Sequence, residues 1–263
     1  MKIIVTVKQV PDPEIPPDHF KVDEAAKKVI PQGGVAPVMN GYDANALEAA
    51  LKLKEQHDAE VVALSLGPAE ARDTLKRALA MGATEAVLLS DPAFEELDSL
   101  ATARTLAAAI QKIGDYDLIM CGRQASDTDA GQVHLGLAEL LGLPAASPIQ
   151  AVEVADGAFK VQRIMEDGHQ VVQLPRPCLV GVSSEIGEPR YPPLKGIMAA
   201  GRAQIPVWSA ADLGLDVEQL KPRRELRRLY VESGETQAEM IEADSPAEAG
   251  EQLALKLREA KLI

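Results

Sequence analysis

Short apolar runs alternate with amphipathic segments along the first 142 residues. The runs are rich in Val, Ile and Leu, which predicts buried strands at 2–7, 60–67, 85–91 and 116–122. Apolar residues at helical spacing predict helices at 43–56, 68–82, 98–114 and 128–142. Gly82, Gly114 and Gly142 close the last three, and Asp43 is the expected N-cap of the first.

This alternation of strand and helix predicts a parallel sheet, because parallel strands need long crossover connections. The strand runs are continuously apolar, as expected when both faces of a sheet are covered. We therefore expect an α/β fold with an open, mainly parallel sheet and helices on both faces.

The pattern changes after Pro144. Asp156-Gly157 separates two alternating runs within 149–165 and predicts a hairpin, and 167–183 adds two more extended segments. Residues 19–38, with Gly33-Gly34, predict a smaller hairpin. We expect a β-rich extension of the sheet here.

The C-terminal region reads as an arm. Residues 221–245 are highly charged with few apolar anchors, whereas 245–263 predict an amphipathic helix with Ser245 as N-cap and Leu253 and Leu257 on one face. We therefore divide the chain into a domain over 1–220 and an arm with a terminal helix over 221–263.

Composition narrows the function. Lys and Arg number 27 against 40 Asp and Glu, a net charge of −13, which argues against nucleic-acid or anionic-lipid binding. Two Cys and four scattered His predict neither a disulfide framework nor a metal site. The N-terminal apolar run is short and Lys8 follows it, so we expect a cytoplasmic location.

The motifs of common catalytic and nucleotide loops do not occur in the sequence. GxSxG, GxxxxGK[ST] and a GxGxxG after the first strand are all missing, and we predict no catalytic residue. Ligands of open α/β sheets bind beyond the carboxyl ends of the strands. The loops to consider are therefore 6–9, 39–43, 66–68, 90–102 and 122–133.

The loop 122–133 is the most informative of these. Gly122 and Gly131 permit close backbone approach, and the amides around Ala130–Val133 would form an anion site at a helix start. The alternative is that Asp127, Thr128 and Asp129 only cap the helix, and that Arg123 is a solvated surface charge. In loop 90–102, Asp98 or Ser99 is the expected N-cap and Thr102 lies in the first turn. That loop either caps its helix or holds a second phosphate.

A proline-rich loop covers 185–198. Pro189, Pro192 and Pro193 stiffen it, and Leu194 is expected at its tip. Leu194 either docks a partner or is tucked into the core.

Five separated motifs together resemble the β subunit of electron transfer flavoproteins. They run in the same order over nearly the whole chain: VKQVPDP, MNGYDANALEAALKLKE, VVALSLGPAEARDTLKRALAMGA, LIMCGRQASDTDAGQV and EPRYPPLKGIMAA. The resemblance implies a nucleotide-binding domain, 1–220, paired with an α subunit that carries the redox FAD and on which the arm packs. The β site holds AMP in respiratory members and a second FAD in electron-bifurcating members.

Site residues follow from the same motifs. The resemblance implies nucleotide contacts at Thr6, Asn40, Gly41, Tyr42, Asp43, Leu66, Gly122, Arg123, Gln124, Ala125, Ser126, Asp127, Thr128, Asp129, Ala130, Gly131, Gln132 and Val133. It implies recognition of a partner dehydrogenase by Leu194, with Tyr191, Ile197 and Met198 beside it.

Two segments depart from the respiratory pattern. A Lys-rich run is replaced by MAAGRAQIP, with Arg202 alone. Loop 90–102 resembles the bifurcating form, SDxxFxGxD[ST]xAT, although Glu96 replaces its Gly and Pro92 a commonly basic residue. Asp98, Ser99 and Thr102 could therefore receive a second phosphate, which favours FAD over AMP.

We expect an electron carrier subunit rather than an enzyme. It would accept electrons from dehydrogenases and pass them to an acceptor such as a quinone oxidoreductase, with the flavin supplying the chemistry. The alternatives are a bifurcating form with NADH as donor, and a non-redox adenine-nucleotide-binding module of similar topology.

Overall fold

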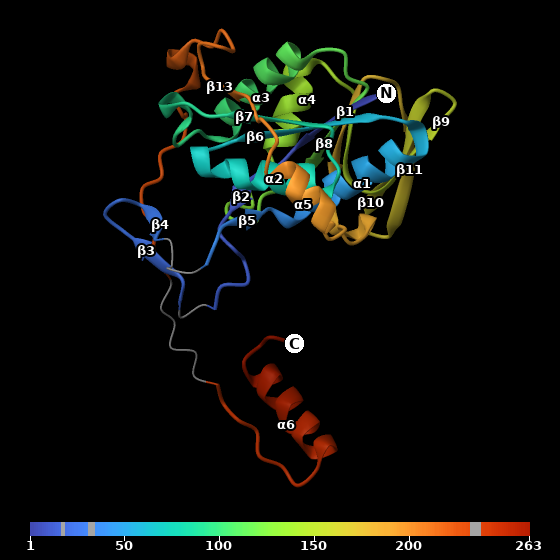
Figure 1. Ribbon diagram of the computed structural model, residues 1–263. Helices are drawn as coiled ribbons and strands as arrows, with labels where there is room; N and C mark the ends of the chain where they lie inside the picture. Colours follow the sequence, from blue (N-terminus) through green and yellow to red (C-terminus); the bar gives the residue numbers. More distant parts are fainter. Residues whose placement is uncertain (17–18, 31–34, 232–237) are drawn as a thin grey trace. The chain divides into compact units, whose positions relative to one another are not determined.

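A mixed sheet with helices on both faces forms the body of the protein (Figure 1). The computed structural model describes residues 1–16, 19–30, 35–231 and 238–263. The described chain divides into two compact units, one of residues 1–21 with 29–227 and one of residues 22–28 with 228–263. No helix among the described residues is long and apolar enough to cross a membrane.

The described strands of the main sheet number nine, in the order β11-β10-β9-β12-β8-β1-β6-β7-β13. Their bounds are β1 Lys2–Thr6, β6 Glu60–Leu66, β7 Glu85–Leu89, β8 Leu118–Gly122, β9 Ala145–Ala155, β10 Ala158–Met165, β11 Gly168–Leu174, β12 Cys178–Val182 and β13 Val207–Trp208. The short strands β2 Gln9–Val10 and β5 Val38–Met39 pair with each other, as do β3 Lys21–Asp23 and β4 Lys28–Ile30.

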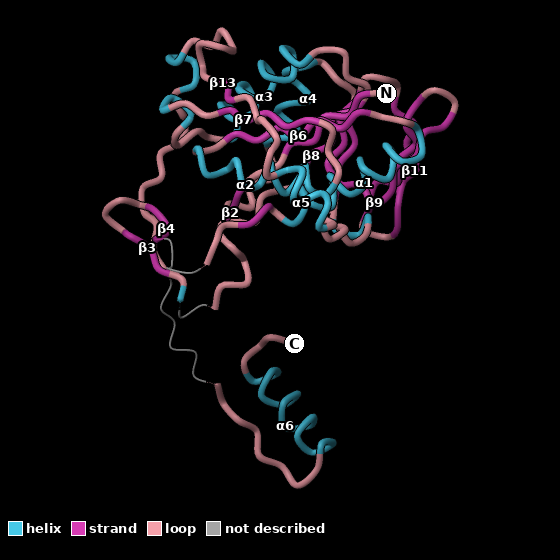
Figure 2. Tube along the Cα trace, in the orientation of Figure 1, coloured by secondary structure: helices cyan, strands magenta, loops and turns pink. Residues whose placement is uncertain are grey.

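The α-helices are α1 Gly41–His57, α2 Arg72–Met81, α3 Ser99–Ile113, α4 Val133–Leu141, α5 Leu194–Ala200 and α6 Pro246–Glu259. Short 3₁₀ turns occupy Ala69–Ala71, Pro92–Phe94, Ser184–Ile186 and Val217–Leu220. The helices of the unit formed by residues 1–21 and 29–227 appear in cyan on either side of the magenta strands of the main sheet in Figure 2.

The predicted parallel sheet is confirmed. The strands β12, β8, β1, β6, β7 and β13 are all parallel to their neighbours, and β12 is also parallel to β9. Alternate side chains along β1 face opposite sides. Ile3 and Val5 join a core with α1 and α2, while Ile4 joins a second core with α3 and α4. Both faces are therefore covered, as the apolar strand runs predict.

Three helix starts differ from the prediction. The second helix begins at Arg72, after a 3₁₀ turn at Ala69–Ala71, and not at residue 68. The first helix begins at Gly41 with Asn40 as N-cap, so Asp43 lies inside the first turn instead of capping it. The fourth begins at Val133 and not near Thr128, because Asp129 and Gly131 have left-handed backbones, with φ of 46° and 59°. Gly82, Gly114 and Gly142 do follow their helices as predicted.

The β-rich extension is also present. Asp156 and Gly157, both with positive φ, connect the antiparallel strands β9 and β10 as predicted. The two extended segments of 167–183 do not pair with each other. β11 adds to β10 at the sheet edge, whereas β12 runs between β8 and β9. All five residues of β12 are buried, which suits a central strand and not an edge.

The second unit contains the terminal helix. Ser245 caps α6 as predicted, its Oγ accepting the Glu248 amide at 3.2 Å. No described residue of α6 is buried. The small hairpin expected within 19–38 is present as β3 and β4, while Gly33, Gly34 and residues 232–237 of the predicted arm lie outside the described residues.

Candidate functional site

The carboxyl ends of the parallel strands meet the start of α1. Asn40, almost fully buried, donates from Nδ2 to the Gln124 carbonyl at 2.9 Å, and its Oδ1 accepts the Ser126 amide at 3.1 Å. Its own amide donates to the Lys8 carbonyl at 2.9 Å. One side chain thus holds the loop after β8 against the segment after β1.

Asp43 completes this junction from inside the first turn of α1. Its carboxylate accepts the Lys8 amide at 2.8 Å and the Gly122 amide at 3.1 Å. Burial raises the pKa of Asp43 from 3.8 to about 7, although these hydrogen bonds and the Lys8 charge favour the ionised form. Asp43 therefore acts as a buried connector between β1, β8 and α1.

Gly122 is required by this packing. A Cβ at residue 122 would lie 2.3 Å from Asp43 Oδ1, 2.8 Å from the Tyr42 Cβ and 2.9 Å from the Asp43 nitrogen. The close approach that we predicted at Gly122 is therefore an approach of α1. At Gly131 a Cβ would meet only the Arg123 carbonyl oxygen, at 3.7 Å, so its left-handed backbone and not space requires glycine.

The loop 123–133 ends in a run of free backbone amides at the start of α4. The amides of Thr128 and Asp129 donate to the Ala125 carbonyl and form a turn. The next four amides, those of residues 130–133, donate to no other group of the described chain. The expectation that Asp127, Thr128 and Asp129 only cap the helix is wrong, because α4 begins beyond them and has no side-chain cap.

The charged side chains of this loop are held by contacts within the protein. Lys8 Nζ contacts both carboxylate oxygens of Asp127, at 2.8 and 2.6 Å. Asp129 Oδ1 accepts a hydrogen bond from the side-chain nitrogen Nε2 of Gln124 at 2.8 Å. Arg123 is half-buried, donates to Ser183 Oγ at 3.3 Å and lies 5.5 Å from the Tyr42 ring centroid. Arg123 is therefore held by its neighbours and is not a free surface charge.

Thr6 and Leu66 end neighbouring strands at the same sheet edge. Register places Thr6 opposite Leu64 of β6, two residues before Leu66. The Thr6 hydroxyl forms a hydrogen bond with the buried Cys121 thiol, and burial raises the pKa of that thiol to about 12. Leu66 packs against the core of α3 and α4.

The start of α3 shares a hollow with the start of α4. Asp98 caps α3 as predicted, accepting the Ala101 amide at 2.9 Å, and it also accepts the Arg223 amide at 2.7 Å. Burial opposes the ionised form of Asp98, but these amides outweigh it and lower the pKa. The hollow is lined by Asp98, Ser99, Leu100, Gln132, Arg223 and Arg224. Residues of both predicted loops, 90–102 and 122–133, therefore line the same hollow, although Thr102 does not.

Glu96 lies just before this hollow with a φ of 61°. The left-handed region favours glycine, which is the residue at this position in the bifurcating-type loop that residues 90–102 resemble.

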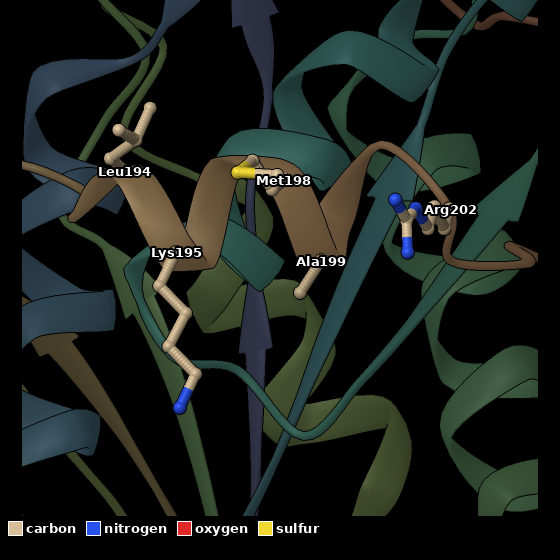
Figure 3. Close-up of a pocket in the computed structure, with 5 residues that line it drawn as sticks. All are labelled: Leu194, Lys195, Met198, Ala199 and Arg202. Carbon is tan, nitrogen blue, oxygen red and sulfur yellow. The ribbon is translucent and has the colours of Figure 1, made fainter.

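The proline-rich loop ends in α5. Leu194 is its first residue and is 74% exposed, so it is neither tucked into the core nor at a loop tip. Tyr191, Ile197 and Met198 are exposed as well. Figure 3 shows Leu194, Lys195 and Met198 projecting from this short helix, with Arg202 just after it. The four predicted recognition residues therefore share an accessible region.

Two contacts fix that region to the body. Arg190 donates to buried Glu48 from its backbone nitrogen, Nε and Nη2 at 2.8–3.1 Å, and also pairs with Glu55. A Cβ at Gly196 would lie 2.2 Å from the Ala80 carbonyl oxygen, so only glycine lets α5 pack this closely on α2. These contacts hold α5 against α1 and α2 and leave its apolar residues exposed.

Sequence reasoning missed several of these residues. Lys8 stands in the quoted VKQVPDP motif and Arg190 in EPRYPPLKGIMAA, yet neither was selected, because their partners Asp127 and Glu48 are distant in sequence. Arg223 and Arg224 were assigned only to the charged arm. No pattern within the arm indicates that it passes the start of α3.

Comparison with known proteins gives consistent matches. Residues 28–213 match the model of the electron transfer flavoprotein domain. The chain is 38% identical to the caffeyl-CoA reductase–Etf complex subunit CarD of Acetobacterium woodii, over 100% of both chains. It is 40% identical to an electron transfer flavoprotein subunit beta of Clostridium acetobutylicum, over 84% of this chain and 83% of the relative. The acryloyl-CoA reductase electron transfer subunit gamma of Anaerotignum propionicum is 36% identical, over 84% and 79%.

Proposed function

Because this chain belongs to the electron transfer flavoprotein family, as a β-type subunit, we propose that it binds an adenine nucleotide beyond the carboxyl ends of its strands. The residues that hold the nucleotide belong to four strand-end segments: Thr6, Asn40–Asp43, Leu66 and Gly122–Val133. The chain serves as the nucleotide-binding partner of an α subunit that carries the redox FAD.

The free amides of residues 130–133 carry this proposal. Unpaired amides at a helix start attract phosphate, because the helix dipole adds to their hydrogen bonds. The left-handed residues Asp129 and Gly131 expose these amides, and Asn40 holds the loop in place. These features hold the loop in the conformation that presents the amides.

FAD is the nucleotide that we favour over AMP. AMP has a single phosphate, whereas FAD has two, joined to a ribityl chain and a ring. The hollow that joins Gln132 to Asp98 and Ser99 lies beside the free amides, and Arg223 and Arg224 supply positive charge there. A second phosphate would be received in this hollow.

Electron transfer is the function that follows. The bound flavin would supply the redox chemistry, while the residues of this chain bind it, orient it and exclude water. The subunit would accept electrons from a dehydrogenase and pass them to an acceptor such as a quinone oxidoreductase. It would act as a cytoplasmic carrier and not as an enzyme by itself.

Electron bifurcation with NADH as donor is the second candidate. Relatives named for caffeyl-CoA and acryloyl-CoA reductase complexes support a role within such an assembly. A second FAD in this subunit would favour it, because bifurcation needs two flavins.

Two surfaces would serve the partners. The exposed Leu194, Tyr191, Ile197 and Met198 would dock a dehydrogenase, since a few side chains that fill pockets of a partner carry most of the binding energy. The arm, 221–263, would pack on the α subunit, because the exposed Leu253 and Leu255 of α6 need a surface to cover them.

The nucleotide released on denaturation of the purified heterodimer tests the proposal. Two FAD per heterodimer would support FAD in this subunit, and one FAD with one AMP would restrict the subunit to a structural nucleotide. A colourless homodimer would instead favour a non-redox nucleotide-binding module and contradict electron transfer.

A further inference from the structure

The loop that presents the free amides also carries negative charge. Asp127 and Asp129 lie just before residues 130–133 in this loop. Carboxylates beside a phosphate repel it by several multiples of thermal energy unless they are compensated. The loop therefore needs compensation before it can accept an anion.

Asp129 and Arg123 do not provide that compensation to Asp127. Asp129 accepts a neutral amide from Gln124, and Arg123 is directed to Ser183 and the Tyr42 ring. The pKa of Glu185 is lowered by the Ser183 hydroxyl and also by the charge of Arg123. Arg123 is therefore engaged with Ser183, Tyr42 and Glu185.

Lys8 meets Asp127 directly. Its Nζ lies 2.8 and 2.6 Å from the two carboxylate oxygens, and the Asp127 side chain is only 23% exposed in this pair. The Lys8 backbone is fixed on both sides, with its amide bonded to Asp43 and its carbonyl to Asn40. The ammonium is thus presented from a rigid strand end to a separate loop.

We propose that Lys8 is a positioning residue that neutralises Asp127 and so makes the loop able to hold a nucleotide phosphate. Lys8 acts through Asp127 and does not contact the nucleotide. This inference rests on the proposed nucleotide site. It predicts that removing the Lys8 charge alone weakens anion binding and that removing the Asp127 charge alone strengthens it. Removing both charges should leave anion binding close to that of the wild type.

The test is calorimetric titration of AMP, and of FAD in parallel, into the nucleotide-free full-length chain in complex with its α subunit. Lys8→Met should weaken AMP binding about tenfold, which corresponds to ~1.4 kcal/mol. Asp127→Asn in the Lys8→Met background should restore wild-type affinity within about twofold. Asp127→Asn alone should bind AMP more tightly than wild type, because Lys8 then keeps its positive charge beside the site without its carboxylate partner. Lys76→Met, which breaks an exposed ion pair with Asp73 at 3.2 Å, is the matched control and should change nothing.

The outcomes distinguish a failure of the proposed nucleotide site from a failure of the proposed role of Lys8. Wild-type protein that binds neither AMP nor FAD would overturn the proposed site and this inference with it. Wild-type binding that Lys8→Met leaves unchanged would overturn the inference alone. A loss in Lys8→Met that Asp127→Asn does not repair would assign a direct phosphate contact to Lys8 and reject the neutralising role. If Lys8→Met does not fold, unchanged or weaker AMP binding by Asp127→Asn alone would also reject the neutralising role.

Discussion

The Asp43 carboxylate occupies the space beside Gly122 that any larger residue would need. It accepts the Gly122 amide at 3.1 Å, while a Cβ at residue 122 would approach Asp43 Oδ1 to 2.3 Å. The first turn of α1 can therefore lie on the end of β8 only because residue 122 has no side chain.

Gly122→Ala should lower the free energy of unfolding by about 2–3 kcal/mol, because the Asp43 nitrogen and the Tyr42 Cβ are also within 3.0 Å of the added methyl. Denaturant unfolding measures this change. Gly41→Ala is the control, since a Cβ there meets no atom within 4 Å. Equal stability of the two variants would contradict the packing described for Gly122.

Asp43 should make stability depend on pH. Burial raises its pKa to about 7 in the folded protein, against 3.8 for an unperturbed carboxyl. Between pH 4 and pH 7 the unfolded chain therefore binds fewer protons than the folded chain, so stability falls as pH rises. Above about pH 7 both states are ionised and the dependence ends.

Asp43→Asn should remove this dependence, because the amide does not titrate. The wild-type minus Asp43→Asn difference in unfolding free energy should decline across pH 4–7, by at most about 4 kcal/mol for a shift of three pKa units. Unfolding curves at several pH values measure it. A difference that stays constant with pH would show that Asp43 titrates normally.

Gly131→Ala should expel the nucleotide. Its φ of 59° makes a side chain cost about 1–2 kcal/mol, and relief of that strain would move the free amides. Gly142→Ala at the other end of α4 is the matched control, with a φ of 64° and no atom within 4 Å of a Cβ. Both variants should lose similar stability, but only Gly131→Ala should lose bound nucleotide on release assays. Full nucleotide content in Gly131→Ala would reject the assignment.

Leu194→Ala should slow electron transfer with the partner dehydrogenase about tenfold, because an exposed anchor contributes on the order of 1–2 kcal/mol to docking. Its melting temperature should not change, since the side chain is 74% exposed. Leu140→Ala, another exposed leucine at the end of α4, is the control for surface truncation. A large drop in melting temperature for Leu194→Ala would make it a core residue and contradict docking.

Glu48→Gln should destabilise the protein by about 2 kcal/mol, because it leaves the half-buried Arg190 without its main partner. Glu55→Gln removes the exposed partner of the same arginine and should have little effect. Hydrogen exchange of 188–200 should rise in the first variant only. Equal exchange in both would show that Glu48 does not anchor α5.

Local patterns in the sequence determined most of the strands, helices and turns. The apolar run of β1 and the helical spacing of α3, with Asp98 before it and Gly114 after it, are set by neighbouring residues, so they could be predicted. The Asp156-Gly157 turn and the Ser245 cap are local for the same reason. The family resemblance added the strand-end segments that form the candidate site.

Only the tertiary structure decided which distant residues meet. Asp43 reads as a helix cap in sequence, but packing moves the helix start to Gly41 and directs its carboxylate to Lys8 and Gly122. β12 reads as the partner of β11, but its fully buried residues require a central place. Lys8 and Asp127 lie 119 residues apart, and their pairing depends on two strand ends meeting at one edge. Such contacts have no local pattern, because burial and charge pairing are settled only when separate elements pack together.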